Sequence, residues 1–223
     1  SRTCKDGDHA VFEVSSPYTE GNAVIAAYDS EDRILWSWHI WLTSDQIEQE
    51  PYYVLERKLA PDGLSYEESY TNTVAAYVMD RNLGAEDARS AGTYYQWGRK
   101  DPFILNADNG VTNYVEQNVA LPSDLDQNPT TFYKTMEIGN WSSETKTIYD
   151  PCPRGYMVPS NSVWTTAPRQ YETNNNGAFR FMDSVYYPVS SYINSEDGKL
   201  VESITTQWSE ESNWGYQTNY RKT

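Results

Sequence analysis

Cysteine and histidine are scarce in this sequence, which contains two of each among 223 residues. A structural zinc site needs about four clustered ligands, and a three-histidine catalytic site needs one histidine more than the chain has. Because His9, His39, Cys4 and Cys152 are spread along the chain, we expect no metal site and no cofactor. Two cysteines are also too few for a disulfide scaffold. They either form one disulfide across a long loop or remain separate thiols.

Positive charge is scarce as well. The chain has 17 Lys and Arg against 32 Asp and Glu, which gives a net charge of −15, and no stretch concentrates the basic residues. Nucleic acid is therefore not an expected partner, because phosphates are bound by clustered positive charge. No run of about 18 apolar residues occurs, so we expect no transmembrane segment. The sequence begins at Ser1 with neither a methionine nor a signal peptide, and we expect it to start inside a longer precursor.

The signatures of common catalytic sites are missing. No Gly-x-Ser-x-Gly elbow, phosphate loop or dinucleotide fingerprint occurs. Paired acids such as Glu67-Glu68 and Glu210-Glu211 lie in polar segments, where carboxylates are usually solvated rather than arranged for glycoside hydrolysis. His39 lies in an apolar segment, which favours a hydrogen-bonded structural histidine over a general base. We therefore expect no catalytic residue and no enzyme activity.

Aromatic residues, in contrast, are abundant, with 19 Tyr and 8 Trp. Residues 34–43 read Ile-Leu-Trp-Ser-Trp-His-Ile-Trp-Leu-Thr, and this β-branched and aromatic content predicts a strand. Alternation places Trp36 and Trp38 on one face and His39 on the other, and both faces are largely apolar. We expect a central core strand, and the alternative is a ligand-binding aromatic strip. The tryptophans expected to be buried structural residues are Trp36, Trp38, Trp97 and Trp164.

The rest of the N-terminal half predicts short elements between polar turns. The expected strands are residues 10–14 and 23–28, both within a leading region 1–29, and residues 93–98. Residues 44–72 turn polar and contain Pro51, Pro61 and Asp62-Gly63, which predicts a variable loop region. A short helix is expected over residues 86–91, because acidic residues start this segment and a glycine follows it.

The C-terminal half contains a long segment, residues 106–141, that is rich in Asn, Asp, Ser and Thr. It predicts a functional loop or an insertion, because long irregular segments inside a domain usually have one of these roles. Three prolines in residues 150–159 predict a rigid turn assembly, and Ser160 is expected to cap a short helix that carries Trp164. The remaining expected elements are strands at 179–187 and 200–204 and a hairpin turn at 196–199.

Aromatic residues in polar loops are the candidate ligand contacts. Flat apolar rings beside amide and carboxylate groups suit sugar recognition, and at least one such ring should be exposed in the free protein. The candidates are Tyr133, Asn140, Trp141, Trp208 and Trp214, and the alternative is that the rings anchor loops. Asp80, Arg81 and Asn82 are expected to brace loops through bidentate Arg–carboxylate bonds, with ligand contact as the alternative.

Several of these segments together resemble a known family. The sequence is similar to the Bacteroidetes fimbrillin-associated surface proteins that carry a major paralogous domain of the Fibrobacter succinogenes type. The matching blocks are residues 34–41, 79–85, 94–103, 150–159 with Trp164, and Tyr187-Pro188 leading to Trp208-Ser209. The family pattern usually continues into a last strand, whereas this chain stops at Thr223. We expect either a truncated C-terminal end or an end at a boundary of ordered structure.

The resemblance implies an α+β fold similar to C-type lectins and sulfatase-modifying-factor (formylglycine-generating-enzyme) domains, with short antiparallel strands, two short helices and long loops. The chain length suits a single domain over residues 1–223. Cys4 and Cys152 do not form the close cysteine pair of the formylglycine-generating enzymes, which makes an enzyme on that scaffold the least favoured reading.

The function that the resemblance implies is a non-enzymatic cell-surface module. We expect an adhesin, or a tip or accessory component of a fimbria, that is a secreted protein or a lipoprotein at the cell surface, associated with the outer membrane or extracellular. The alternative is a surface glycan-binding domain for polysaccharide capture. The expected partners are a carbohydrate or a host or bacterial surface ligand, and fimbrial subunits.

Overall fold

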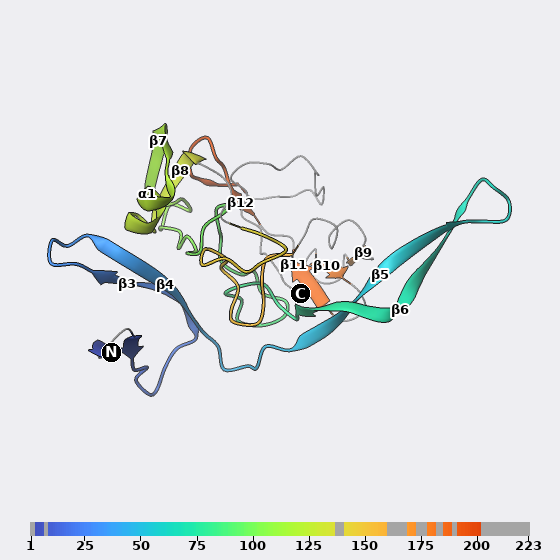
Figure 1. Ribbon diagram of the computed structural model, residues 1–223, viewed down its shortest axis with the longest axis horizontal. Coiled ribbons are helices and arrows are strands. Elements are labelled where there is room, and N and C mark those ends of the chain that lie inside the picture. Colours follow the sequence, from blue (N-terminus) through green and yellow to red (C-terminus); the bar gives the residue numbers. More distant parts are fainter. Residues whose placement is uncertain are drawn as a thin grey trace.

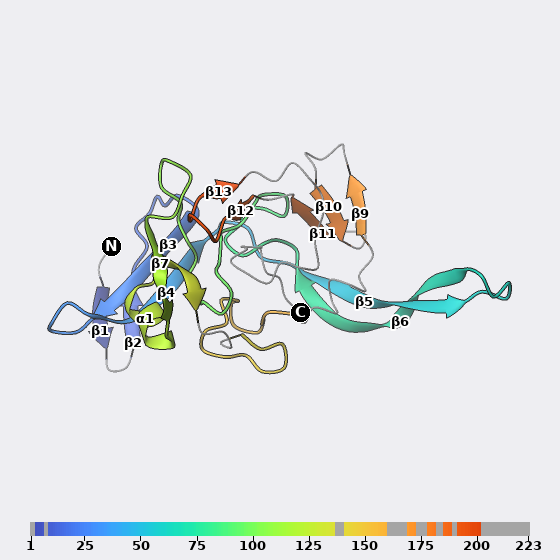
Figure 2. The same ribbon diagram turned by 90° about the horizontal axis from the view of Figure 1, so that it is seen from above.

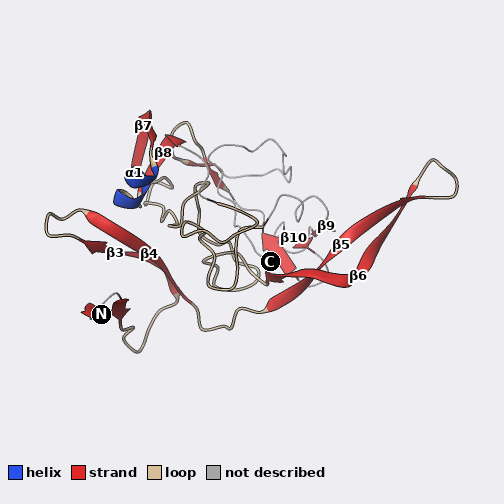
Figure 3. Cartoon of the chain, in the orientation of Figure 1, coloured by secondary structure: helices blue, strands red, loops and turns tan. Residues whose placement is uncertain are grey.

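The computed structural model describes residues 3–6, 9–136, 141–159, 169–172, 178–181, 185–188 and 191–201. These residues form a β-rich fold of mostly short strands with very little helix (Figures 1 and 3). The strands are β1 (Thr3–Asp6), β2 (His9–Phe12), β3 (Gly21–Tyr28), β4 (Ile34–Leu42), β5 (Gln49–Leu59), β6 (Tyr66–Met79), β7 (Asn113–Ala120), β8 (Thr131–Met136), β9 (Arg169–Glu172), β10 (Ala178–Phe181), β11 (Val185–Pro188), β12 (Tyr192–Ile193) and β13 (Leu200–Val201). Among the described strands, all sheets have two strands except the three-stranded sheet of β9, β10 and β11.

The expected tryptophan strand is confirmed as β4, which pairs antiparallel with β3. Asp29 closes the connection between them, because its Oδ1 atom accepts hydrogen bonds from the backbone N–H groups of Glu31 and Arg33 at 2.8 and 2.9 Å. Among the described strands β3 is the one partner of β4, so the expected central strand is not central in its sheet. One face of the pair is half-open, because other segments cover it only in part: Trp36 is half-buried and Trp38 is 37% exposed.

Residues 44–72, expected as a variable loop region, instead belong largely to a long antiparallel hairpin of β5 and β6, which we call the arm. Figures 1 and 2 both show the arm extending away from the rest of the molecule. Its pairing shifts register next to Tyr53, where β6 carries extra residues opposite β5. Bulges of this kind bend and twist a strand. The loop marker Asp62-Gly63 is at the turn of the arm.

The expected α+β arrangement with two helices is not confirmed. Residues 86–91 form turns instead of a helix, and the described residues contain a single helix, α1 (Pro122–Gln127). α1 connects β7 to β8, and these two strands pair in parallel. Residues 106–141, expected as a long irregular segment that is a functional loop or an insertion, therefore contain two strands and a helix. No helix in the described part of the chain is long and apolar enough to cross a membrane.

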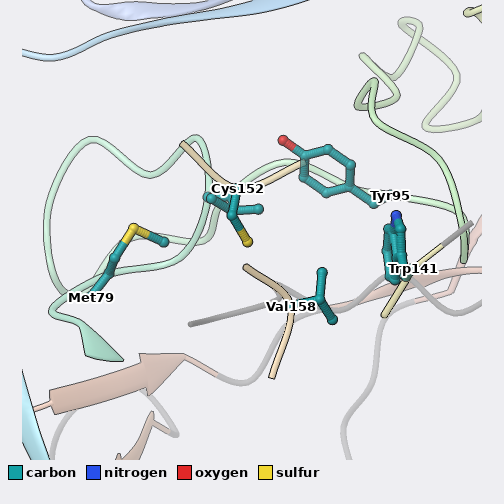
Figure 4. Packing of buried hydrophobic residues seen from close by; sticks show 6 residues of the cluster. Met79, Tyr95, Trp141, Cys152 and Val158 are labelled. Atoms are coloured by element: carbon teal, nitrogen blue, oxygen red, sulfur yellow. The ribbon is translucent and has the colours of Figure 1, made fainter. Parts of the chain in front are cut away.

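The hydrophobic core is built mainly from irregular segments between the hairpins. Its larger cluster consists of Met79, Leu83, Tyr95, Trp141, Cys152 and Val158. Figure 4 shows the Cys152 side chain among Met79, Tyr95 and Val158, with the Trp141 ring to one side. A smaller cluster consists of Phe103, Val111, Phe132 and Ile193. The rings of Phe103 and Phe132, 5.4 Å apart, join the segment after Tyr95 to β8.

The short connections of the C-terminal part agree in part with expectation. The single strand expected at 179–187 is wrong, because this segment contains two strands, β10 and β11, that pair antiparallel with each other. A turn joins β12 to β13 where the hairpin turn was expected at 196–199. The strand expected at 93–98 is reduced to a bridge between Tyr94 and Phe103. The helix expected after Ser160, with Trp164, lies outside the described residues.

Candidate binding surfaces

Asp80, Arg81 and Asn82 lie in a buried turn directly after β6. The Arg81 guanidinium donates from Nε to Asp80 Oδ1 at 3.0 Å and from Nη2 to Asp80 Oδ2 at 2.9 Å. Its Nη1 atom donates to the carbonyl of Glu86 at 2.8 Å, and the hydrogen bond to Asp80 raises the Arg81 pKa. The guanidinium therefore ties the root of the arm to the following turn, and its charge is neutralised by Asp80.

His39 lies in a fixed chain of hydrogen bonds. Asn22 Nδ2 donates to the Gly84 carbonyl at 2.8 Å, so Asn22 Oδ1 is the acceptor for His39 Nε2 at 2.9 Å. His39 Nδ1 then accepts the Tyr95 hydroxyl at 2.9 Å. Burial lowers the pKa of His39 to about 4, against a smaller opposing effect of Asp101. The imidazole is neutral near pH 7 and both of its nitrogens are engaged, which favours a structural role over a general base.

Lys100 is the centre of a second polar group, on the edge of β4. Its Nζ atom lies 2.5 Å from Asp101 Oδ2 and donates to the Ser37 hydroxyl and, at 3.0 Å, to the Ser37 carbonyl. The Ser37 hydroxyl donates to Asp101 Oδ2 at 2.6 Å. The ammonium group also lies 4.4 Å from the centre of the Trp36 ring. This buried ion pair fixes the segment after Tyr95 against β4.

Two half-buried rings and a carboxylate adjoin this ion pair. The Trp36 and Tyr149 rings are 6.0 Å apart, and the Tyr149 hydroxyl donates to Asp126 Oδ2 at 3.1 Å. Burial raises the Asp126 pKa, although the Tyr149 hydrogen bond and the charge of Lys100 lower it. We call these three residues the Trp36–Tyr149–Asp126 group. Sequence analysis missed it, because no local signal relates Tyr149 to Asp126 on α1.

Two tryptophans differ in burial from what the sequence predicts. Trp141, a candidate exposed contact, is only 7% exposed, and its Nε1 atom donates to the carbonyls of Arg99 at 3.2 Å and Tyr149 at 2.9 Å. Trp97, expected to be buried, is 40% exposed, with its ring centre 5.0 Å from that of Trp141. Trp141 therefore anchors its loop, and Trp97 presents an aromatic surface.

The other candidate contacts are only partly described. Tyr133 is half-buried on β8, burial raises the pKa of its hydroxyl, and its backbone carbonyl accepts a hydrogen bond from Gln96. Asn140, Trp208 and Trp214 lie outside the described residues. The structure thus provides no described cluster in which these candidates meet, and the surface that they would form stays a prediction.

Cys152 is buried in the larger core cluster, next to an organised proline turn. Asp150 holds this turn, because its carboxylate accepts the backbone N–H groups of Cys152 at 2.9 Å and Val158 at 2.8 Å and lies 2.8 Å from Lys146 Nζ. Cys4 is on β1, but its side chain is outside the described part, so the disulfide stays a prediction.

The turn of the arm presents an exposed apolar tip, formed by Leu59, Leu64 and Tyr66. Leu64 is 90% exposed. Asp62 organises the turn, since its carboxylate accepts the backbone N–H groups of Leu64 and Ser65 at 2.9 and 3.0 Å and the Ser65 hydroxyl at 2.7 Å. These bonds lower the Asp62 pKa. Asp62 therefore organises the turn while the apolar side chains of the tip stay exposed.

A metal centre has no support among the described residues, where no three His, Cys, Asp or Glu side chains are grouped to hold an ion. Comparisons with protein-family models, curated proteins and solved structures found no match. Three surface features thus remain for functional interpretation, namely the arm with its tip, the half-open face of β3 and β4, and the Trp36–Tyr149–Asp126 group.

Proposed function

We propose that the chain is a non-enzymatic cell-surface module, an adhesin or a tip or accessory component of a fimbria, and that the arm is its contact element. The observation that carries this proposal is the exposed apolar tip at the end of a projecting hairpin. Exposed apolar side chains grouped on a protruding element are typical of contact sites. The resemblance to fimbrillin-associated surface proteins adds the extracellular setting.

The buried ionisable groups support a binding role over a catalytic one. Arg81 is paired with Asp80, Lys100 with Asp101, and His39 is held neutral between two hydrogen-bond partners. Each of these groups is occupied by hydrogen bonds or an ion pair that join segments of the core. A catalytic acid or base instead needs a proton that it can exchange with substrate at the working pH.

Cell adhesion tests this proposal. A strain lacking the gene should adhere less to its host surface, and the wild-type gene should restore adhesion. Leu64→Ser should restore it poorly, because the apolar tip is lost. The matched control is Ile148→Ser, at an apolar side chain that is 70% exposed and is not part of the arm. Normal adhesion of the deletion strain would refute the proposal.

Glycan capture is the second candidate function, and the Trp36–Tyr149–Asp126 group favours it. Aromatic rings beside a hydroxyl and a carboxylate suit a sugar, which needs an apolar face and hydrogen-bond partners together. A glycan array on the purified chain tests it, with Asp126→Asn and Tyr149→Phe as variants. A sugar bound equally by the wild type and both variants would exclude this group as the site.

A further inference from the structure

The half-open face of the β3–β4 pair is the first of two apolar surfaces that lie far apart. The register places Ala23 opposite Ile40, Ile25 opposite Trp38, and Ala27 opposite Trp36, so all six side chains share one face. The other face is the one tied to the body, through the hydrogen bonds of Ser37, His39 and Trp41. On the first face, Trp36 contacts Lys100 and Tyr149 of the body, and the open part lies around Ala23 and Trp38, which are both exposed.

This face and the tip both carry few charged groups. β3 and β4 read GNAVIAAY and ILWSWHIWL, in which His39 is the sole ionisable group besides Tyr28 and is neutral near pH 7. The tip segment, residues 59–66, contains one charged group, the Asp62 carboxylate that the turn itself hydrogen-bonds. Two chains with a net charge of −15 repel each other. The tip and the face are surfaces at which two copies can approach with little of this repulsion.

The two surfaces lie at opposite ends of the described structure. Figures 1 and 2 both show the β3–β4 pair at one end and the turn of the arm at the other. One chain therefore cannot cover its own face with its own tip in this conformation. A contact between two different surfaces is heterologous, and such contacts continue as an open chain unless the rotation between copies closes a ring.

We propose that the tip of the arm, with Leu59, Leu64 and Tyr66, packs on the half-open β3–β4 face of a second copy, so that copies assemble head to tail. The aromatic strip around Trp38 receives the Leu64 side chain, and both lose exposed apolar surface. This inference rests on the proposed function in that it names the partner of a fimbrial component as the chain itself. Assembly of this kind requires no rearrangement of the arm, because Asp62 already fixes the turn.

Sedimentation velocity of the purified chain over a range of concentrations tests this assembly. The wild type should form a ladder of species that grows with concentration. Leu64→Ser removes the tip, and Ala23→Asp places a charge on the face at an exposed position where folding is little affected. Each variant alone should associate at least about tenfold more weakly, as expected for a residue central to a contact. Ile148→Ser should assemble as the wild type does.

A mixture of the two variants gives the decisive result. The Leu64→Ser chain retains an intact face and the Ala23→Asp chain retains an intact tip, so one junction can form and no more. The mixture should yield a species of two chains and nothing larger. A wild type that stays monomeric, a ladder that persists in either variant, or a mixture that stays monomeric would each overturn the inference.

The outcome is separable from that of the proposed function. Normal assembly with no role in adhesion would leave head-to-tail association standing and remove the adhesin. If adhesion depends on Leu64 but the chain never self-associates, the adhesin function would stand and head-to-tail association would be refuted. Ala23→Asp also separates them, since it should abolish assembly while leaving the tip available to any other surface.

Discussion

Replacing Lys100 by methionine removes the ammonium group of the buried Lys100–Asp101 ion pair. Methionine retains much of the aliphatic length, so the change is chiefly electrostatic. Asp101 would then keep the Ser37 hydroxyl as a partner for Oδ2, while its buried Oδ1 atom already has no hydrogen-bond partner among the described residues. Breaking a buried pair in this way costs about 3–5 kcal/mol, because an uncompensated charge is left inside.

Urea unfolding at pH 7 measures this cost as a fall in the free energy of unfolding, with the slope against denaturant unchanged. The double variant Lys100→Met with Asp101→Asn should recover part of the loss, since the Asp101 charge is removed together with its partner and the amide oxygen can still accept the Ser37 hydroxyl. The matched control is Lys58→Met, which removes an exposed pair with Glu56 at 3.7 Å. Exposed pairs contribute at most about 1 kcal/mol. A loss at Lys100 no larger than that at Lys58 would refute the reasoning.

Three further predictions concern folding stability. Between pH 7 and pH 5 the wild type should lose about 2 kcal/mol that His39→Gln does not lose, measured by urea unfolding, because the unfolded histidine binds its proton near pH 6.5 and the folded one, with its pKa lowered to about 4, does not. Gly84→Ala should lower the melting temperature more than Gly63→Ala: both have positive φ, but a Cβ at Gly84 would lie 2.7 Å from Thr93 and one at Gly63 meets nothing within 4 Å. Trp141→Ala should cost about 3–5 kcal/mol in thermal unfolding, and an unchanged melting temperature would restore its role as a ligand contact.

Local chemistry was sufficient to predict the β3–β4 pair. The aromatic and β-branched content of β4 suits a pleated strand, and the Asp-rich turn before it ends β3, so both elements could be read from neighbouring residues. What alternation could not reveal was the number of strands in the sheet. Trp38 is exposed because other segments cover its side of the β3–β4 pair only in part, and that packing depends on the whole topology.

The outer part of the arm could not be predicted from alternation, because its described side chains are exposed on both faces. Charged residues such as Glu56 and Lys58 then occur where a half-buried strand would carry apolar ones, and the segment resembles a loop. The helix expected over 86–91 failed for a local reason. Asp87 Oδ1 accepts hydrogen bonds from the backbone N–H groups of Arg89 and Ser90, both at 2.8 Å, and these bonds favour a turn over a helix.

The burial of Trp97 and Trp141 is the reverse of that predicted, and the cause lies in contacts between segments far apart in the sequence. Trp141 is buried because the carbonyls of Arg99 and Tyr149 both accept its indole N–H, and Met79 and Cys152 close the same cluster. None of these partners is adjacent in sequence. Polar neighbours along the chain predict exposure only when no distant segment covers the ring, so the candidate site could be predicted less well than the strands.

Because the arm is long, its outer part can open locally while the rest of the protein stays folded. At the base of the arm the side chains of Tyr52, Val78 and Met79 are buried. Toward the tip the apolar side chains are exposed, and the two strands are held together mainly by backbone hydrogen bonds. A two-stranded hairpin of this kind is only marginally stable in water. Backbone amides near the tip should therefore exchange their hydrogens through local fraying, and those near the root only through global unfolding. The projecting element can thus yield to a pulling force while the irregular core remains folded.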